Sequence, residues 1–430
     1  MAENDVSLKD GAAEEQDEIA EALIDIFRRV GENSVNGEIS TAANRTSDHP
    51  FHGGYQATPQ SPDSFGSTSG IALFMAAYHL ATKDQRAREM AIHSASRLRP
   101  GASQVPVHSG IPTPHEHGSG GLAGVGSMVF AFVQLAAWLK MPEFLDSARE
   151  AVASITPGRI MTEERLDVTC GCAGTLLALL SFIEKVTAMD MDSGSAPDLA
   201  LLCGRRLLEK RVSDNSGPRA WPAVDSLPNS GFAHGAAGIA YALVRLFQFT
   251  GREEFRDAAV EGFAFERTLY APQIQSWFDA RRNLAPEIAS HYRDASGVAL
   301  GILGSIVAID SHALRHDLEQ VLSISRTLPE SAVDHLCCGN FARVETMHVA
   351  GNVLGRLQLS AHARHLAIQL LTRAATSGFR FQPSHHQCNS SGTDVSHHPL
   401  FVGLAGVGYT LLRLNYPNLF PSMLLMETVV

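Results

Sequence analysis

A short glycine turn followed by an apolar helix recurs along the chain, and this repeat constrains the possible folds more than any other feature. GCAGTLLALLSFI from Gly171 and GAAGIAYALVRLF from Gly235 show the pattern clearly. In all, seven segments carry it, and they begin at residues 67, 121, 171, 235, 294, 339 and 403. Internal repetition of this kind is typical of folds in which neighbouring units stack and bury a shared core.

Amphipathic segments such as REEFRDAAVEGFAFERTL and HALRHDLEQVLSISRTL alternate with the apolar ones. Their charged residues recur on one face at helical spacing. An apolar helix must be covered on most sides, whereas an amphipathic helix needs cover on one side only. Seven such pairs, with almost no strand signals, predict an all-α fold in which seven inner helices are enclosed by seven outer helices. The glycine turns would open at one end of this closed double ring, where a site is most easily assembled.

The composition of the 430-residue chain excludes several classes of protein. Its net charge is −11 and no basic cluster offsets the acidic residues, which argues against nucleic acid as a partner. No apolar run reaches the roughly 20 residues that a membrane span needs. Residues 1–17 are acidic and lack an apolar core, so we expect a disordered tail there and one domain over residues 18–430. Six cysteines and no export signal favour a reducing, cytoplasmic location.

Three of the glycine turns carry reactive side chains. His234 directly precedes one turn, and Asp167 lies four residues before Gly171. The adjacent cysteines Cys337 and Cys338 directly precede the glycine of a third turn. If the ring closes, these side chains approach the same rim, and together they suit metal-assisted acid–base chemistry. Each also has a structural interpretation: a helix N-cap for the aspartate, a structural histidine with its hydrogen bonds satisfied for His234, and core packing for the cysteines.

At these turns the chain resembles the lanthionine synthetase C-like cyclases, and most closely the cyclase domain of the class II lanthipeptide synthetases. The resemblance covers about residues 18–430. It is carried most specifically by GFAHGAAGIAYALVRL, DHLCCGNFARVE and the C-terminal LFVGLAGVGYTLLRLNYPNLFPSMLLME. The fold that it implies is an α/α toroid of seven inner and seven outer helices, which agrees with the repeat.

The resemblance also implies an activity. The family adds cysteine thiols of a precursor peptide to dehydroalanine or dehydrobutyrine, which forms lanthionine or methyllanthionine thioether rings. Zinc would bind the substrate thiol, with Cys337 and Cys338 as zinc ligands, and His234 and Asp167 would have acid–base roles. The chain carries no dehydratase region, so we expect either a separate dehydratase as a partner beside the precursor peptide or a sequence that is one domain of a larger synthetase.

One zinc ligand of the family is missing from its motif. The family's first ligand is a cysteine in a WCxGxxG turn, but the corresponding stretch here is HYRDASG, with Tyr292 at the cysteine position and His291 before it. A first interpretation is that another residue completes the site: His291, or Cys388 and the histidines at 385, 386, 397 and 398.

Two further interpretations remain open. Zinc is absent and cyclisation proceeds by acid–base chemistry alone, or the protein is a catalytically degenerate, zinc-poor peptide-binding protein that assists a separate modifying enzyme. With two thiolates and His291 as the only ligands, we expect zinc to bind more weakly than at a site with the full set.

Overall fold

The computed structural model describes residues 2–35, 68–98, 120–122, 124–213, 217–222, 228–273, 276–277, 295–381 and 400–428, and for residues 2–14, 33–35 and 276–277 the backbone alone. These residues are mostly helical. Their only paired strands of more than one residue are β1 (Tyr270–Ala271) and β2 (Ser276–Trp277), which pair antiparallel with Tyr270 opposite Trp277. The predicted all-α class is confirmed.

The described residues contain both predicted sets of helices. The apolar helices are α2 (Thr68–Thr82), α4 (Val125–Leu139), α7 (Cys172–Thr187), α9 (Ala236–Thr250), α11 (Ala295–Ser305), α13 (Asn340–Leu354) and α15 (Leu404–Asn415). The amphipathic helices are α1 (Ala2–Val35), α3 (Gln85–Ser96), α5 (Glu143–Ala153), α8 (Ala196–Glu209), α10 (Glu253–Thr268), α12 (His312–Thr327) and α14 (Leu357–Ser377). The short helix α6 (Pro157–Thr162) is an addition that the repeat does not predict.

Helix α1 begins at Ala2, inside the segment for which the sequence predicts a disordered tail. Alanine and glutamate are frequent there, and both are good helix formers. The backbone of these residues is therefore helical, while the division of the chain at residue 17 stays a prediction.

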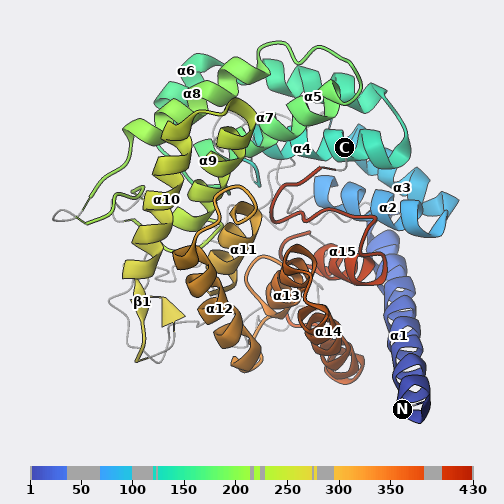
Figure 1. Cartoon of the computed structure of the whole chain (residues 1–430). Helices are drawn as coiled ribbons and strands as arrows, with labels where there is room; N and C mark the ends of the chain where they lie inside the picture. The colour runs from blue at the N-terminus through green and yellow to red at the C-terminus, as the bar shows by residue number, and fades with distance from the viewer. Residues whose placement is uncertain are drawn as a thin grey trace, which may run out of the picture. The chain divides into compact units, whose positions relative to one another are not determined.

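The chain divides into two compact units. The first comprises Met1–Ala42, Gly70–Ser94 and Glu330–Pro421, and the second comprises Ala43–Ser69, Ala95–Pro329 and Ser422–Val430. Within the second unit, α4 packs on α7, α7 on α9 and α9 on α11 (Figure 1). Each of these four apolar helices also packs against the amphipathic helix that follows it, namely α5, α8, α10 or α12.

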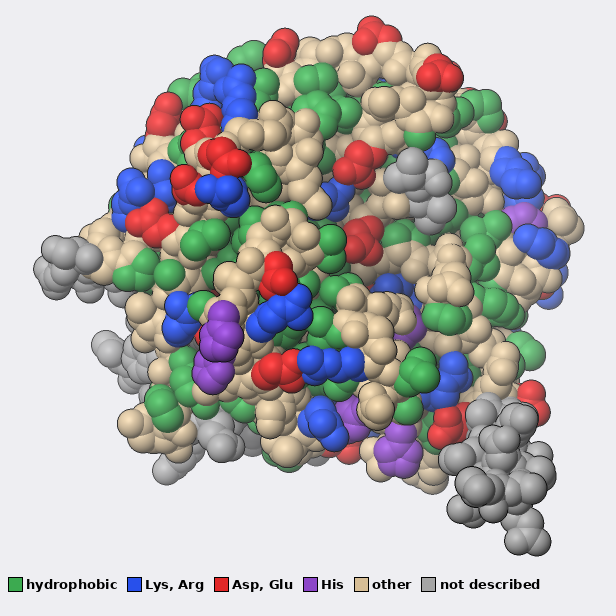
Figure 2. Space-filling view, viewed as in Figure 1, with side chains coloured by type: hydrophobic (Ala, Val, Ile, Leu, Met, Phe, Trp, Pro, Cys, Tyr) green, Lys and Arg blue, Asp and Glu red, His purple; other side chains and the backbone are tan. Residues whose placement is uncertain are grey.

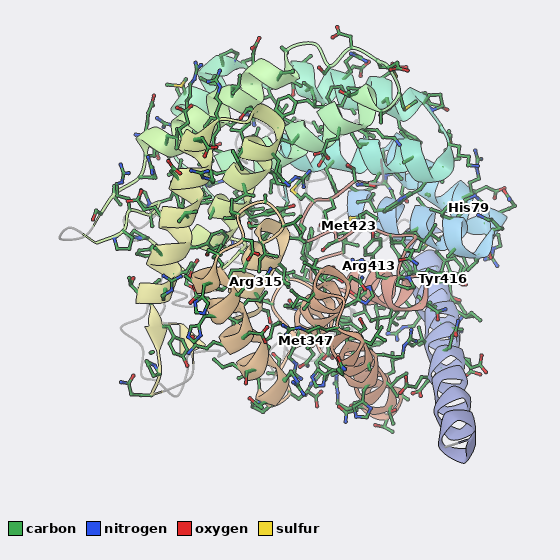
Figure 3. All side chains as sticks on the ribbon, viewed as in Figure 1. His79, Arg315, Met347, Arg413, Tyr416 and Met423 are labelled. Atoms are coloured by element: carbon green, nitrogen blue, oxygen red, sulfur yellow. The ribbon has the colours of Figure 1, made fainter. Side chains whose placement is uncertain are left out.

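The first unit is built from α1, α13, α14 and α15 together with most of α2 and α3. The Phe27 ring of α1 stacks on Tyr78 of α2 with centroids 4.3 Å apart. Inside this unit, Arg413 of α15 forms a buried ion pair with Glu345 of α13 (Figure 3 labels Arg413). Buried charges require such partners, because an unpaired charge in the interior is costly.

The glycine turns that precede the apolar helices hydrogen-bond to one another. In the second unit, Leu122 N donates to Thr169 O and Thr169 N donates to Ala233 O, each at 3.1 Å. In the first unit, Cys337 N donates to Phe401 O at 3.0 Å. The helix N-termini of α4, α7 and α9 therefore gather at one end of the second unit, and those of α13 and α15 gather in the first. The prediction that all seven turns share one rim concerns both units together, and it stays a prediction.

A segment near the C-terminus, Ser422–Glu427, crosses the apolar helices of the second unit. Three successive carbonyl oxygens each accept a hydrogen bond from a different helix: Leu425 O from Tyr241 at 2.8 Å, Met426 O from Ser181 at 2.8 Å, and Glu427 O from Gln134 at 2.7 Å. The Leu425 and Met426 side chains are fully buried. This segment is therefore part of the core of the second unit.

The surface over α8 and α10 carries both signs of charge. Figure 2 shows acidic and basic side chains next to each other there. Glu261 of α10 pairs with both Arg211 and Arg219, at 2.8 Å and 2.9 Å. A charged outer face is what the amphipathic pattern of the two helices predicts, and the two arginines come from the segment that follows α8.

Candidate functional site

Asp167 and His234 form a hydrogen-bonded pair in the second unit. Asp167 lies in the turn before α7, where its Oδ1 accepts a hydrogen bond from Cys170 N at 2.7 Å. Its Oδ2 lies 3.0 Å from Nδ1 of His234, which belongs to the turn before α9. Asp167 therefore caps a backbone N–H group before α7, as an N-cap residue would. Its other carboxylate oxygen also contacts His234.

The exposure of the two side chains differs in a useful way. The Asp167 side chain is 11% exposed and the His234 side chain 31%. Because an ionised carboxylate only accepts hydrogen bonds, the bond assigns the proton of the neutral imidazole to Nδ1. A histidine held in this tautomer exchanges protons with other molecules through Nε2. The pair can therefore serve as a general acid or base.

The two turns are joined by further hydrogen bonds. Thr169, two residues after Asp167, donates from both its backbone N and its Oγ1 to Ala233 O, at 3.1 Å and 3.0 Å. Ala233 directly precedes His234. The position of the imidazole relative to the carboxylate is therefore set by backbone contacts as well as by the side chains.

Cys337 and Cys338 lie in the first unit, in the turn before α13. Their Sγ atoms are 3.2 Å apart, well beyond the roughly 2.05 Å of a disulfide bond, so no disulfide joins the two residues. Nδ1 of His335 lies 3.6 Å from Sγ of Cys338. Among the described residues, this is the one group of three histidine, cysteine or carboxylate side chains close enough to share a metal ion, with all donor atoms within 4.8 Å of one another.

Sequence reasoning missed His335. The imidazole is held in place by Phe381: Nε2 donates a hydrogen bond to the Phe381 carbonyl at 2.7 Å, and the two rings lie parallel, 5° apart in orientation. With Nε2 as the donor, the lone pair of Nδ1 faces the cysteines. Burial lowers the pKa of His335, but its contacts with the Cys338 thiol and the Phe381 carbonyl outweigh burial, and the net shift is upward. A histidine two residues before a cysteine pair is the signal that could have found it.

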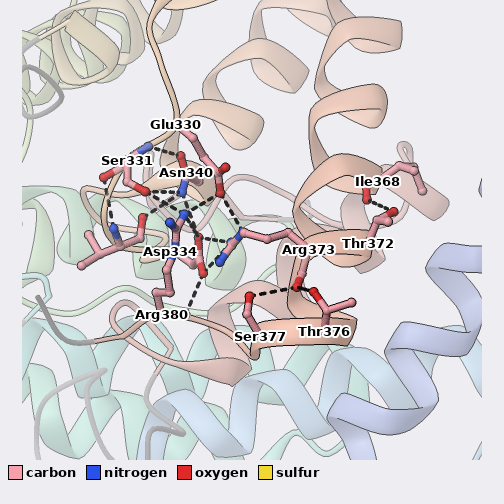
Figure 4. A network of polar contacts seen from close by, with 11 residues as sticks. Glu330, Ser331, Asp334, Asn340, Ile368, Thr372, Arg373, Thr376, Ser377 and Arg380 are labelled. Carbon is pink, nitrogen blue, oxygen red and sulfur yellow. Dashed lines mark hydrogen bonds and ion pairs between the residues drawn. The ribbon is translucent and has the colours of Figure 1, made fainter. Parts of the chain in front are cut away.

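A buried aspartate, Asp334, anchors the turn that carries Cys337 and Cys338 through several hydrogen bonds. Asp334 is fully buried and accepts hydrogen bonds from Arg373 at 2.7 Å, Arg380 N at 2.7 Å and the Asn340 side chain at 2.8 Å (Figure 4). Asn340 in turn accepts from Ser331 N at 2.7 Å. The residues on both sides of the cysteines are thereby anchored to α14 and to the segment that follows it.

The donor set fits zinc. Two thiols and one imidazole are ligands that zinc prefers, and three protein ligands are typical of a site that keeps one position for a substrate. A metal-binding histidine usually donates its other ring N–H to a carbonyl or carboxylate, as Nε2 of His335 does. His291 and Tyr292 lie outside the described residues, as do Cys388 and the histidines at 385, 386, 397 and 398.

The predicted site residues thus fall into two groups. The structure brings Asp167 together with His234 in the second unit, and Cys337 together with Cys338 in the first. The convergence of all four on one pocket stays a prediction.

Comparison with solved structures identifies the fold as an α/α toroid. Nisin cyclase superposes with a TM-score of 0.59 at 16% sequence identity, over 85% of this chain and 93% of that chain. The Lin0763 protein from Listeria innocua superposes with a TM-score of 0.50 at 10% identity, over 82% of this chain and 97% of that chain. The fold predicted from the repeat is confirmed.

The sequence identifies the family. The model of the lanthionine synthetase C-like protein family matches residues 59–425, and the chain therefore belongs to this family. No curated protein sequence gives a significant match. None of the described helices is both long and apolar enough to cross a membrane. The closer likeness to class II cyclase domains stays an expectation.

Proposed function

We propose that this protein is a peptide cyclase, which adds cysteine thiols of a precursor peptide to its dehydroalanine or dehydrobutyrine residues and forms lanthionine or methyllanthionine. Its membership of the lanthionine synthetase C-like family supports this activity. The observation that carries the proposal is the position of His335, which offers a third donor beside Cys337 and Cys338 although the family's first cysteine is replaced by Tyr292.

Cys337, Cys338 and His335 would hold zinc. When bound, zinc lowers the pKa of a coordinated thiol, so that the cysteine of the peptide is present as the thiolate at neutral pH. The protein's own contribution is the fixed turn: the Asp334 hydrogen bonds and the Phe381 carbonyl hold the three donors before any metal binds. Because the three side chains are already held in place, little conformational entropy would be lost when zinc binds.

The acid–base step falls to the histidine–aspartate pair. Addition of sulfur to the β-carbon of the dehydro residue forms the C–S bond and leaves an enolate at the α-carbon. The α-carbon gains a proton and the thiol loses one, so that the sum is an addition without oxidation or reduction. His234 would deliver the proton through Nε2, while Asp167 holds Nδ1–H and stabilises the charged form of the ring.

The experiment uses a dehydrated precursor peptide that contains free cysteines, with zinc present. Ring formation is followed by mass spectrometry as the loss of alkylatable thiols, since cyclisation itself leaves the peptide mass unchanged. We expect His234→Gln to slow ring formation by about 100-fold or more while peptide binding remains. His365→Gln, an exposed histidine on α14, is the matched control and should cyclise at the wild-type rate.

A second candidate function is a peptide-binding protein without catalysis. Tyr292 at the position of the family's first cysteine favours it. Wild-type protein that binds the dehydrated peptide, yet leaves its thiols to react at the rate seen without protein, would support this candidate and contradict the cyclase.

The proposed partners follow from the same chemistry. The dehydro residues must be made before the thiol adds, and we propose that a separate dehydratase supplies them. None of the described cysteines forms a disulfide bond, which agrees with a reducing compartment, and we propose a cytoplasmic location.

A further inference from the structure

Glu266 is a buried carboxylate on a helix whose charged residues mostly face solvent. It lies near the end of the amphipathic helix α10 and is 2% exposed. Its position continues the buried face of α10 at helical spacing, but the other buried residues of this helix are apolar or glycine. A carboxylate is kept inside a protein only when hydrogen bonds or opposite charges compensate for its lost hydration.

The compensation comes from the turn that carries His234. Oε2 of Glu266 accepts a hydrogen bond from the Ser230 hydroxyl at 2.6 Å. Oε1 accepts from Gly231 N at 3.0 Å and from Ala237 N at 2.7 Å. These donors stand on both sides of His234, so one carboxylate ties together the beginning and the end of its turn.

The turn needs an acceptor from elsewhere. The N-cap residue of α9 is Gly235, which has no side chain to accept from the first backbone N–H groups of the helix. A Cβ at Gly235 would lie 2.1 Å from the Ser230 carbonyl, so a capping side chain cannot be placed there. Glu266 supplies the missing cap from a neighbouring helix, and its negative charge is favourable at a helix N-terminus.

Together with Thr169, Glu266 holds the turn from two directions. Thr169 binds Ala233 O from the side of α7, and Glu266 binds Gly231 N and Ala237 N from α10. We infer that Glu266 is a positioning residue, which sets the His234 turn so that the imidazole keeps its hydrogen bond to Asp167. This inference rests on the proposed function for its kinetic consequence, but its structural consequence can be tested without any turnover.

Asp317 offers a matched control for a role in stability alone. It is a buried carboxylate of α12, 7% exposed, and it binds Arg267, the residue next to Glu266, through contacts of 2.6 to 3.0 Å. Asp317→Asn therefore removes a buried charge beside the same helix without touching the turn. Glu266→Gln removes the charge that holds the turn and introduces an amide N–H₂ where an acceptor is needed.

The first measurement is the tautomer of His234, read from the ring nitrogen chemical shifts in NMR at a pH where the ring is neutral. We expect the Nδ1–H tautomer in the wild type and in Asp317→Asn, and a mixture with the Nε2–H tautomer in Glu266→Gln. Glu266→Asp keeps the charge and should restore part of the Nδ1–H population. It also provides a foldable variant should the glutamine variant fail to fold.

The second measurement is ring formation on a dehydrated peptide. We expect Glu266→Gln to lower kcat by about 10- to 100-fold with KM changed by less than about threefold, since a displaced catalytic group costs rate rather than binding. Asp317→Asn should keep the wild-type kcat. Glu266 variants with the wild-type tautomer, and a stability loss equal to that of Asp317→Asn, would overturn the inference. If the wild type forms no rings, the proposed function fails while the tautomer measurement still decides the role of Glu266.

Discussion

His335 shows how one side chain can change the interpretation of a metal site. Its Nδ1 reaches the two cysteines from within the same turn, so the described donor set needs no ligand from the segment around Tyr292. The weak zinc binding expected from the sequence assumed that the two thiolates had only His291 beside them. With His335 as a third donor, we expect tighter binding.

A zinc-affinity measurement tests this residue directly. We expect His335→Ala to weaken zinc binding by on the order of 100-fold, because a site with two remaining protein ligands compensates poorly for the desolvation of the metal. Competition with a chromogenic chelator gives the affinity. His291→Ala and His365→Ala should leave it unchanged. A loss confined to His291→Ala would identify His291 as the third ligand instead.

A second histidine of the first unit gives a prediction on pH. His348 of α13 is 3% exposed and accepts a hydrogen bond from the Asn352 side chain at 3.2 Å. Burial, together with the nearby charges of Arg413 and Arg364, lowers its pKa to about 4, against the opposing effect of Glu345. The folded protein thus keeps this ring neutral at a pH where the unfolded chain protonates it.

The sign of the effect follows from linkage. Above the unfolded pKa of 6.5 the ring is neutral in both states, and its full contribution to stability is present. Between 6.5 and about 4 only the unfolded state gains the proton, so the free energy of unfolding falls as the pH falls, by about 3 kcal/mol in total. In urea titrations at several pH values across this range, the free energy of unfolding of His348→Gln should fall less steeply with falling pH than that of the wild type. An unchanged slope would contradict the assignment, and the exposed His365→Gln serves as the control.

At the scale of elements, the segment Ser422–Glu427 behaves as a core element although it is neither helix nor strand. Its carbonyl oxygens are satisfied by side chains of α4, α7 and α9 in place of a backbone ladder. Buried backbone groups need such partners, because each unsatisfied group costs on the order of 1 to 3 kcal/mol. The segment therefore depends on a few polar side chains within otherwise apolar helices.

Tyr241 is the most informative of these side chains. Its hydroxyl donates to Leu425 O and accepts from Arg245, both at 2.8 Å, and burial raises its pKa to about 12. We expect Tyr241→Phe to lower the free energy of unfolding by about 2 kcal/mol, because two buried partners lose their hydrogen bond. Chemical denaturation measures the difference. Tyr416→Phe, which changes a half-buried tyrosine of the first unit, should cost less than about 0.5 kcal/mol.

At the scale of the whole molecule, the two units hold different parts of the proposed chemistry. The first unit contains the proposed zinc donors, and the second contains the proposed acid–base pair together with Glu266. Zinc held by these donors would bind the folded turn and not the unfolded chain, so its binding free energy would add to stability.

Hydrogen exchange can show where this stabilisation acts. We expect zinc to slow amide exchange in the turn of residues 333–342, where Gly339 N and Ala342 N both bond to His335 O, and to change exchange at residues 229–237 far less. The melting temperature should rise with zinc and fall on chelation, by an amount equivalent to about 2.7 kcal/mol at a free zinc concentration 100 times Kd. The double variant with Cys337→Ala and Cys338→Ala should lose both responses. Equal protection in both turns would contradict a site confined to the first unit.

The sequence by itself determined the helical class, the order of apolar and amphipathic helices and four of the reactive side chains: Asp167, His234, Cys337 and Cys338. The reason is that helical periodicity and turn glycines are local properties. An apolar helix must be buried wherever it lies, and a glycine turn marks its start in any context.

Only the tertiary structure decided which polar atoms meet. The orientation of His335 depends on a carbonyl 46 residues further along the chain, and Glu266 reaches a turn that begins 36 residues before it. A periodic sequence pattern does not predict hydrogen bonds between residues so far apart in the chain. Glu266 continues the buried face of its own helix, but a carboxylate is kept there because the hydrogen bonds that compensate for its burial come from another segment of the chain.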